Sequence, residues 1–190
     1  EANIKGQGEW QTYQRPAFLD PNDPLFDKIA DIYYDEQEKL FGKAVYFAGD
    51  PFHEGGQSEG IDVKAAAKKI LQAMRRKTPE AVWIIQGWQR NPIRDLLEGL
   101  EHGEAIILDL MACERPQWGG IKNSLFYKAE GHMHHDWIWC ALPNFGGKTG
   151  LHGKMSSYAS GVVFAKNHPL GKNLCGIGTC LLYTSPSPRD

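Results

Sequence analysis

The residues best suited to chemistry follow a small apolar run, in the stretch Asp50-Pro51-Phe52-His53-Glu54-Gly55-Gly56. The run before it, Val45-Tyr46-Phe47-Ala48, is typical of a buried β-strand that ends at the rim of a sheet or barrel. Catalytic groups concentrate on loops that a rigid scaffold holds, and in barrels they lie at the strand ends. Glu54 is therefore a candidate general acid or base, and a loop carboxylate that caps a helix is the alternative. The same motif supplies His53 and Asp50 as candidate substrate contacts.

A histidine and two glycines flank Glu54, so its side chain can pack on one side and face a substrate on the other. Such burial raises the pKa of a carboxyl group toward the value that a general acid needs. The pair His53-Glu54 also begins the zinc-protease motif, which requires a second histidine four residues after the first. Position 57 is Gln57, so the zinc-protease interpretation fails.

A second group of polar residues is the run His132-Met133-His134-His135-Asp136. It directly precedes a predicted strand, in which neighbouring side chains point to opposite faces. No further ligand stands at a spacing that zinc sites use. We therefore expect a polar loop near the rim of the sheet, and no metal site.

Aromatic and amide side chains near other strand ends are suited to binding a sugar. Indole rings stack on the apolar face of a sugar ring, and the amides of Gln and Asn bond to its hydroxyl groups. Gln86 and Trp88 follow a predicted strand at 81–85, and Asn144 stands before two glycines after a later strand. Trp139 lies within that later strand, where a place in the hydrophobic core explains it equally well.

Strands and helices alternate along the chain. Apolar runs predict strands at 45–48, 81–85, 105–108, 137–142 and 174–177, and helical periodicity predicts helices at 23–42, 62–78, 91–103 and 154–165. This alternation is typical of an α/β fold with a parallel sheet. Polar or glycine-rich segments follow the strands and no G-x-G-x-x-G motif is present, which favours a (β/α)8 TIM-type barrel. Since such a barrel needs about 250 residues, the five or so strand–helix units here predict a partial barrel with strands missing before Glu1.

Composition excludes several classes of protein. The formal net charge of −2 leaves no basic stripe for nucleic acid. No apolar run approaches the roughly 18 residues of a membrane span. Four cysteines without a C-x-x-C pair support neither a zinc knuckle nor a dense disulfide framework. The chain starts at Glu1 with no initiator methionine or signal peptide, so this end does not reveal the compartment.

The last stretch, residues 180–190, has no hydrophobic periodicity and contains two Ser-Pro steps. It resembles the translation of a transposase-type sequencing adapter, and segments of that origin are left out of fold reasoning. We therefore predict a partial catalytic barrel over residues 1–179 and a non-native tail over residues 180–190. We also expect the chain to be incomplete at both ends.

Taken together, the motifs resemble the alpha-N-acetylglucosaminidase family of glycoside hydrolases, family 89. The matching segments occur in family order over nearly all of residues 10–179, at 18–26, 50–56, 81–88, 108–110, 137–140, 144–147 and 176–179. The His-Glu-Gly-Gly form resembles bacterial members of the family. Two features depart from the family pattern: Met111-Ala112-Cys113-Glu114 replaces a Phe-Ala-Glu sequence, and Pro143 precedes Asn144.

The resemblance implies an enzyme that removes terminal α-linked N-acetylglucosamine from a glycan with retention of configuration, without a metal or organic cofactor. Glu54 falls on the family's general acid/base, which protonates the glycosidic oxygen and then activates water. The family's nucleophile is a Glu shortly after the segment at 176–179, where Cys180 follows here, so we expect this chain by itself to be inactive. The resemblance also implies a secreted, periplasmic or cell-surface location.

Two further functions stay open. One is a retaining hydrolase of another α-linked amino sugar, which a comparison of N-acetylglucosaminide with N-acetylgalactosaminide substrates would separate. The other is a non-catalytic carbohydrate-binding protein on a degenerate barrel. A carboxylate soon after Thr179 in the natural sequence would indicate the enzyme, and its absence would indicate the binding protein.

Overall fold

The computed structural model describes residues 1–10, 12–52, 56–119, 129–143 and 153–179. The elements in chain order are β1 (Ile4–Lys5), β2 (Glu9–Trp10), β3 (Tyr13–Gln14), β4 (Phe18–Leu19), α1 (Pro24–Phe41), β5 (Tyr46–Ala48), α2 (Val63–Lys77), β6 (Val82–Gly87), α3 (Arg94–Glu98), β7 (Ala105–Asp109), α4 (Ala129–Met133), β8 (Asp136–Ala141), α5 (Met155–Asn167), the 3-10 helix η2 (Pro169–Gly171) and β9 (Leu174–Thr179). The predicted tail at 180–190 lies outside the described residues.

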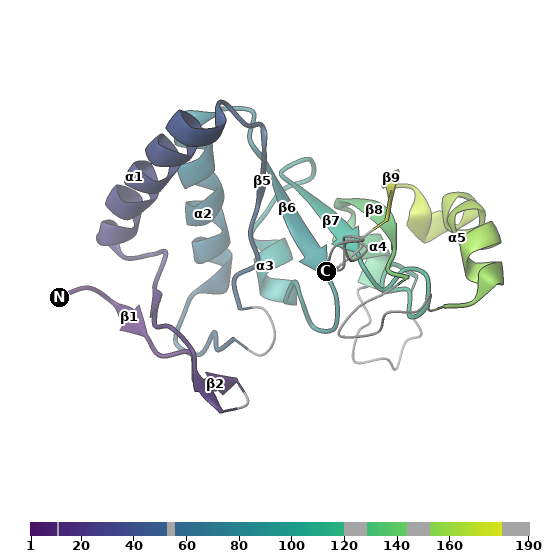
Figure 1. Ribbon diagram of the computed structural model, residues 1–190, viewed down its shortest axis with the longest axis horizontal. Coiled ribbons are helices and arrows are strands. Elements are labelled where there is room, and N and C mark those ends of the chain that lie inside the picture. The colour runs from purple at the N-terminus through teal and green to yellow at the C-terminus, as the bar shows by residue number, and fades with distance from the viewer. Residues whose placement is uncertain (11, 53–55, 120–128, 144–152, 180–190) are drawn as a thin grey trace, which may run out of the picture. The chain divides into compact units, whose positions relative to one another are not determined.

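Five of the strands form one sheet in the order β5-β6-β7-β8-β9 (Figure 1). The pairs β5–β6, β7–β8 and β8–β9 are parallel. Parallel neighbours need a crossover connection, and a helix lies in the chain between each strand and the next. The predicted α/β class with about five strand–helix units is therefore confirmed.

The chain divides into two compact units. Unit 1 contains Glu1–Ile85 and Asn91–Ala105, and unit 2 contains Gln86–Arg90 and Ile106–Asp190. Unit 1 also holds two small antiparallel ladders, β1 with β4 and β2 with β3, which the sequence did not predict. These strands are only two residues long, so they carry no alternation that could be read from the sequence.

Helix α1 begins and ends as its sequence predicts. The Asp23 side chain caps the first turn by accepting a hydrogen bond from the Leu25 N–H at 2.8 Å, and Pro24 occupies the first helical position. At the other end Gly42 has φ 80°, and its N–H donates to the Glu38 carbonyl at 2.8 Å. The predicted helix over residues 91–103 is shorter, because α3 ends at Glu98, where the Gly99 N–H caps the carbonyls of the last turn.

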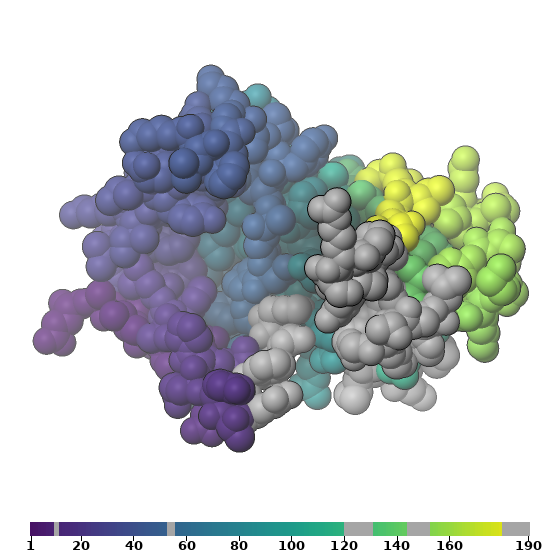
Figure 2. Space-filling view, viewed as in Figure 1, coloured from purple at the N-terminus to yellow at the C-terminus, as the bar shows by residue number. Residues whose placement is uncertain are grey.

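The packing of α1 differs from what its apolar stripe predicts. The stripe Leu25, Ile29, Ile32, Tyr33 and Leu40 lies exposed, with Ile32 65% and Leu40 73% accessible. In Figure 2, α1 forms part of the visible surface of unit 1, in blue-purple. The opposite face of α1, which carries aspartates, contacts α2 instead, and the two helices lie side by side in Figure 1.

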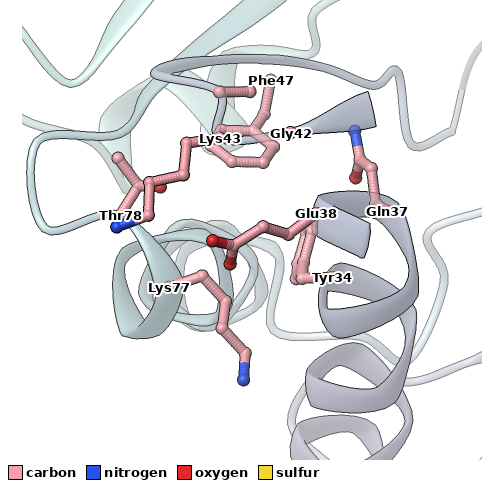
Figure 3. A pocket seen from close by; sticks show the side chains of 9 residues that line it. Tyr34, Gln37, Glu38, Gly42, Lys43, Phe47, Lys77 and Thr78 are labelled. Carbon is pink, nitrogen blue, oxygen red and sulfur yellow. The ribbon is translucent and has the colours of Figure 1, made fainter. Parts of the chain in front are cut away.

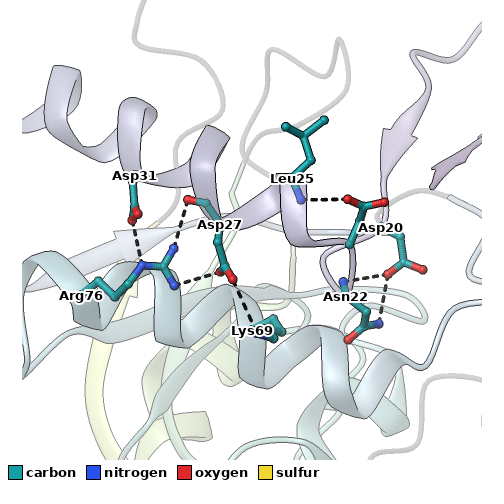
Figure 4. A network of polar contacts seen from close by, with 8 residues as sticks. Asp20, Asn22, Leu25, Asp27, Asp31, Lys69 and Arg76 are labelled. Carbon is teal, nitrogen blue, oxygen red and sulfur yellow. Dashed lines mark hydrogen bonds and ion pairs between the residues drawn. The ribbon is translucent and has the colours of Figure 1, made fainter. Parts of the chain in front are cut away.

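Ion pairs join the aspartate face of α1 to α2. The Arg76 guanidinium on α2 donates to the carboxylates of Asp27 at 2.9 Å and Asp31 at 2.8 Å (Figure 4). The Lys69 ammonium lies 3.6 Å from the second oxygen of Asp27. Pairs as exposed as these contribute at most about 1 kcal/mol each, so most stabilisation of unit 1 comes from its apolar core.

The core of each unit lies where a strand meets its covering helix. In unit 1 the buried side chains include Phe47 and Trp83 on the strands and Ala67 and Leu71 on α2. In unit 2 they include Ile107, Trp118, Trp137, Trp139 and Cys140. No helix among the described residues is both long enough and apolar enough to cross a membrane.

Candidate functional site

Three of the predicted site residues, Glu54, His53 and Asn144, lie outside the described residues. Their predicted roles therefore stay predictions. The described residues on either side of positions 53–55 show how the chain is held at the end of β5.

The chain at the two ends of the segment 53–55 makes a close approach. Phe52 is buried, has φ 63° and packs its ring edge-on against Phe18 at a centroid distance of 5.2 Å. A Cβ atom at position 56 would lie only 2.7 Å from the Phe52 Cα, so the backbone leaves room for Gly56 alone. A phenylalanine with positive φ is an unusual conformation that surrounding contacts must maintain, and such residues cluster at functional sites.

A side chain from the N-terminal part of unit 1 fixes the chain directly after Gly56. The Gln7 amide accepts a hydrogen bond from the Gln57 N–H at 3.0 Å and donates to the Gln57 carbonyl at 2.9 Å. Gln7 is buried, and bonding both of its amide atoms satisfies a group that is costly to bury alone. The motif around Glu54 is thus attached to the scaffold on both sides.

Asp50, a predicted substrate contact, lies half-buried just after β5. Its carboxylate accepts a hydrogen bond from the Asn91 side-chain amide at 3.3 Å. The neighbouring Gly49 carbonyl accepts a hydrogen bond from the Trp83 indole N–H at 2.8 Å, which ties the end of β5 to β6. Asn91 is buried and belongs to unit 1, so the end of β5 is joined at Asp50 to a segment that lies 41 positions later in the chain.

Gln86 and Trp88, two more predicted contacts, lie in unit 2 where β6 ends. Gln86 is exposed and Trp88 half-buried. The chain directly after them is held by the buried Gln117, whose amide donates to the Gln89 carbonyl at 2.9 Å. The two residues therefore stand on a segment that is anchored within unit 2, and their contact with a substrate stays a prediction.

The carboxylate that organises unit 2 is Asp109, which the sequence placed after a strand but did not identify as a site residue. Asp109 is 0% exposed. It accepts hydrogen bonds from the backbone N–H groups of Met111 at 3.1 Å, Gln117 at 3.2 Å and Trp118 at 3.3 Å. His132 Nε2 lies 3.1 Å from the same carboxylate. The signal in the sequence was an acidic residue directly after a buried strand.

His132 is not in the polar loop near the sheet rim that the sequence predicts. Its side chain is 0% exposed, with its ring 5.6 Å from that of Trp137. Residues 131–134 all have positive φ, between 57° and 66°, so the backbone forms a left-handed turn. This turn carries His132 into the core toward Asp109, which lies 23 positions earlier in the chain. Among the described residues, no group of three or more His, Cys, Asp or Glu side chains could hold a metal ion.

Trp139, the remaining predicted contact, packs between β8 and α5. It is 3% exposed, and a Cβ atom at Gly161 of α5 would lie 2.9 Å from its ring. The sequence left a place in the hydrophobic core open for Trp139, and its indole does lie there. Trp139 also lines a cavity in unit 2. A role in substrate binding stays a prediction for this residue.

Unit 1 holds a cavity of about 10 Å³ among α1, β5 and the end of α2 (Figure 3). This volume is about that of a single water site and is too small for a sugar. Tyr34 and Phe47 line it with rings 5.4 Å apart, and burial is the main cause that raises the pKa of Tyr34 to about 12.

Comparison with known proteins places this chain among glycoside hydrolases. A family model described as the alpha-N-acetylglucosaminidase (NAGLU) TIM-barrel domain matches residues 1–182, which confirms the predicted barrel class. The human alpha-N-acetylglucosaminidase (Homo sapiens) is 30% identical over 184 residues, which is 89% of this chain and 24% of the human protein.

Solved structures of a family 89 glycoside hydrolase from Clostridium perfringens are similar as well. Its complex with PUGNAc matches with a TM-score of 0.82 and 31% identity over 99% of this chain. A variant with two glutamates replaced by glutamine, in complex with its substrate GlcNAc-α-1,4-galactose, matches with a TM-score of 0.79 and 31% identity over 97% of the chain. This chain spans 21% of the clostridial chains, so it corresponds to about a fifth of their length.

Proposed function

Because this chain belongs to the alpha-N-acetylglucosaminidase family of glycoside hydrolases, we propose that it is part of an exo-glycosidase that removes terminal α-linked N-acetylglucosamine with retention of configuration. The single observation that carries this proposal is the family match over residues 1–182, which includes the motif at 50–56. The clostridial relative in complex with GlcNAc-α-1,4-galactose supports a glycan with terminal α-linked N-acetylglucosamine as the substrate.

In the proposed mechanism, Glu54 is the general acid/base. As an acid it protonates the glycosidic oxygen, and the sugar then bonds to a nucleophilic carboxylate. As a base it removes a proton from the water that releases the sugar. Retaining enzymes place the two carboxyl groups about 5–5.5 Å apart. The anchored backbone at Phe52 and Gly56 supports this role, since a catalytic group must be held in a defined position.

The chain of residues 1–190 by itself is proposed to be inactive, because the family's nucleophile follows the segment at 176–179 and Cys180 stands there instead. A chimera supplies the missing parts. Residues 1–179 replace the matching segment of the clostridial hydrolase, which the similarity of the two structures supports. Release of nitrophenol from a nitrophenyl α-N-acetylglucosaminide then measures the function of this segment.

We expect the chimera to turn over, and the Glu54→Gln variant to lose about 10²–10⁴-fold in rate. Azide should restore part of that activity by replacing water as the nucleophile. The matched control is Glu59→Gln, the same change at an exposed glutamate shortly after the motif, and it should leave the rate unchanged. Full activity of Glu54→Gln would refute the acid/base role, and a preference for an N-acetylgalactosaminide would refute the proposed substrate.

A further inference from the structure

A cavity of about 250 Å³ lies in unit 2, between the chain that follows β7 and the helix α5. Ligand pockets for drug-sized molecules are about 300–1,000 Å³, so this volume suits a ligand with a single ring. One wall is the segment 112–118, which follows the carboxyl end of β7. The other wall is α5, which follows β8 in the chain. In barrels that end of the strands binds the substrate.

Contacts within unit 2 hold the floor of the cavity rigidly. Trp118 donates its backbone N–H to Asp109 at 3.3 Å, and its ring stacks on Trp137 with a centroid distance of 5.4 Å and an interplanar angle of 16°. Trp139 lies under α5, where only a glycine at position 161 fits against its ring. Both floor indoles are almost fully buried. A preformed cavity costs little ordering entropy when a ligand binds.

The walls combine an apolar ring with hydroxyl groups. Phe164 of α5 lines the cavity and is 64% exposed, and its ring lies 6.0 Å from that of Trp118. Ser160 lies about one turn before Phe164 and Ser156 about two turns before it, both exposed and on one side of the helix. The Ser160 hydroxyl donates to the Ser156 carbonyl at 2.7 Å, which leaves its oxygen lone pairs to accept from a ligand.

Charge narrows the class of ligand. Glu114 is the acidic side chain among the described lining residues, and none of them is Lys, Arg or His. A phosphate, sulfate or carboxylate group would therefore meet repulsion without a cation to balance it. A carboxylate accepts hydrogen bonds from neighbouring hydroxyl groups, and an aromatic face packs against the C–H groups of a sugar ring.

We propose that this cavity binds one neutral pyranose ring of a glycan, with the ring packed on Phe164 and its hydroxyl groups bonded to Ser156, Ser160 and Glu114. The inference rests on the proposed glycosidase function for the source of the sugar. It adds a binding subsite in unit 2 that takes part in no bond cleavage, so it can be tested without turnover.

The test measures binding of methyl α-glycosides of N-acetylglucosamine, glucose and galactose to the 190-residue chain by saturation-transfer NMR. Ser160→Phe fills the cavity from an exposed position. Ala159→Phe is the matched control. It adds the same ring at the exposed residue directly before Ser160, which does not line the cavity. We expect a glycoside to bind the wild type and Ala159→Phe equally, and Ser160→Phe to weaken that binding about tenfold or more. Glu114→Gln, which keeps the size of the side chain, should weaken binding less.

Thermal melts of the proteins are compared first, so that lost binding is not mistaken for lost structure. Equal binding by the two phenylalanine variants would overturn the inference, and so would the absence of binding by a folded wild-type chain. Tight binding of tetramethylammonium in place of the glycosides would overturn it as well, since an aromatic ring beside a carboxylate also suits a cation. Hydrolysis by the chimera is a separate measurement: if Glu54→Gln retains turnover while Ser160→Phe loses binding, only the proposed mechanism fails.

Discussion

Replacing Asp109 tests whether one buried carboxylate holds unit 2 together. Its side chain is fully buried and accepts backbone hydrogen bonds from Met111, Gln117 and Trp118, with His132 at 3.1 Å. Asp109→Ala removes all of these acceptors at once. The N–H groups of Gln117 and Trp118 are then left buried without a partner, because both bonds lie in the interior.

The magnitude follows from the number of groups left unpaired. Each buried donor without a partner costs about 1–3 kcal/mol, and breaking a buried network costs about 3–5 kcal/mol in total. We therefore expect Asp109→Ala to lower the free energy of unfolding by about 4 kcal/mol. Asp109→Asn keeps the size of the side chain and one oxygen, which can take the place of the oxygen that faces Gln117, Trp118 and His132. Its NH2 group then faces the Met111 N–H, which is the one donor left without an acceptor. Its expected cost is about 1–2 kcal/mol.

Urea unfolding followed by tryptophan fluorescence measures these differences, since Trp118 and Trp137 stack beside the site. Hydrogen exchange of the Gln117 and Trp118 amides locates the loss, and both should exchange faster in Asp109→Ala. Glu101→Ala, at an exposed carboxylate, should change stability by no more than about 0.5 kcal/mol. An Asp109→Ala protein with the wild-type midpoint and protected amides would refute the central role of this carboxylate.

Two further predictions concern packing and pH. Gly161→Ala places a Cβ atom 2.9 Å from the Trp139 ring, and we expect the forced shift of α5 to cost about 1–3 kcal/mol in a thermal melt; an unchanged melting temperature would contradict this close approach. Burial raises the pKa of Tyr34 to about 12 from its ordinary value of 10.0, so the folded state keeps the phenol proton that the unfolded state loses. Stability should therefore fall as pH rises from about 10 to 12, and urea midpoints of Tyr34→Phe should fall less over that range. Parallel midpoints for the two proteins would show that Tyr34 does not cause the fall.

The helices and strands of the sheet could be read from local signals. Asp23 and Asp62 accept hydrogen bonds from N–H groups of the first turns of α1 and α2, as their positions predict. The apolar runs became β5 to β9 with small changes at their ends. Caps and strand runs depend on neighbours in the chain, so the information for them lies within a few residues.

Which element packs against each face of a helix could not be predicted from the sequence in the same way. Periodicity predicted which residues of α1 share a face, yet the aspartate face contacts α2 while the apolar stripe is exposed. Periodicity assigns residues to a face but does not say which element covers it. The β1–β4 and β2–β3 ladders were missed for a related reason, since two-residue strands are defined only by their partners.

The sequence by itself determined the class of the fold, the order of its elements and the motif that holds Glu54, because each depends on residue types at short spacing. Only the tertiary structure decided that Phe52 meets Gly56, that Gln7 holds Gln57, and that Asp109 meets His132. These contacts join residues up to 50 positions apart. Which distant groups meet depends on how the elements pack, and a backbone conformation such as the left-handed turn at 131–134 is stable only within that packing.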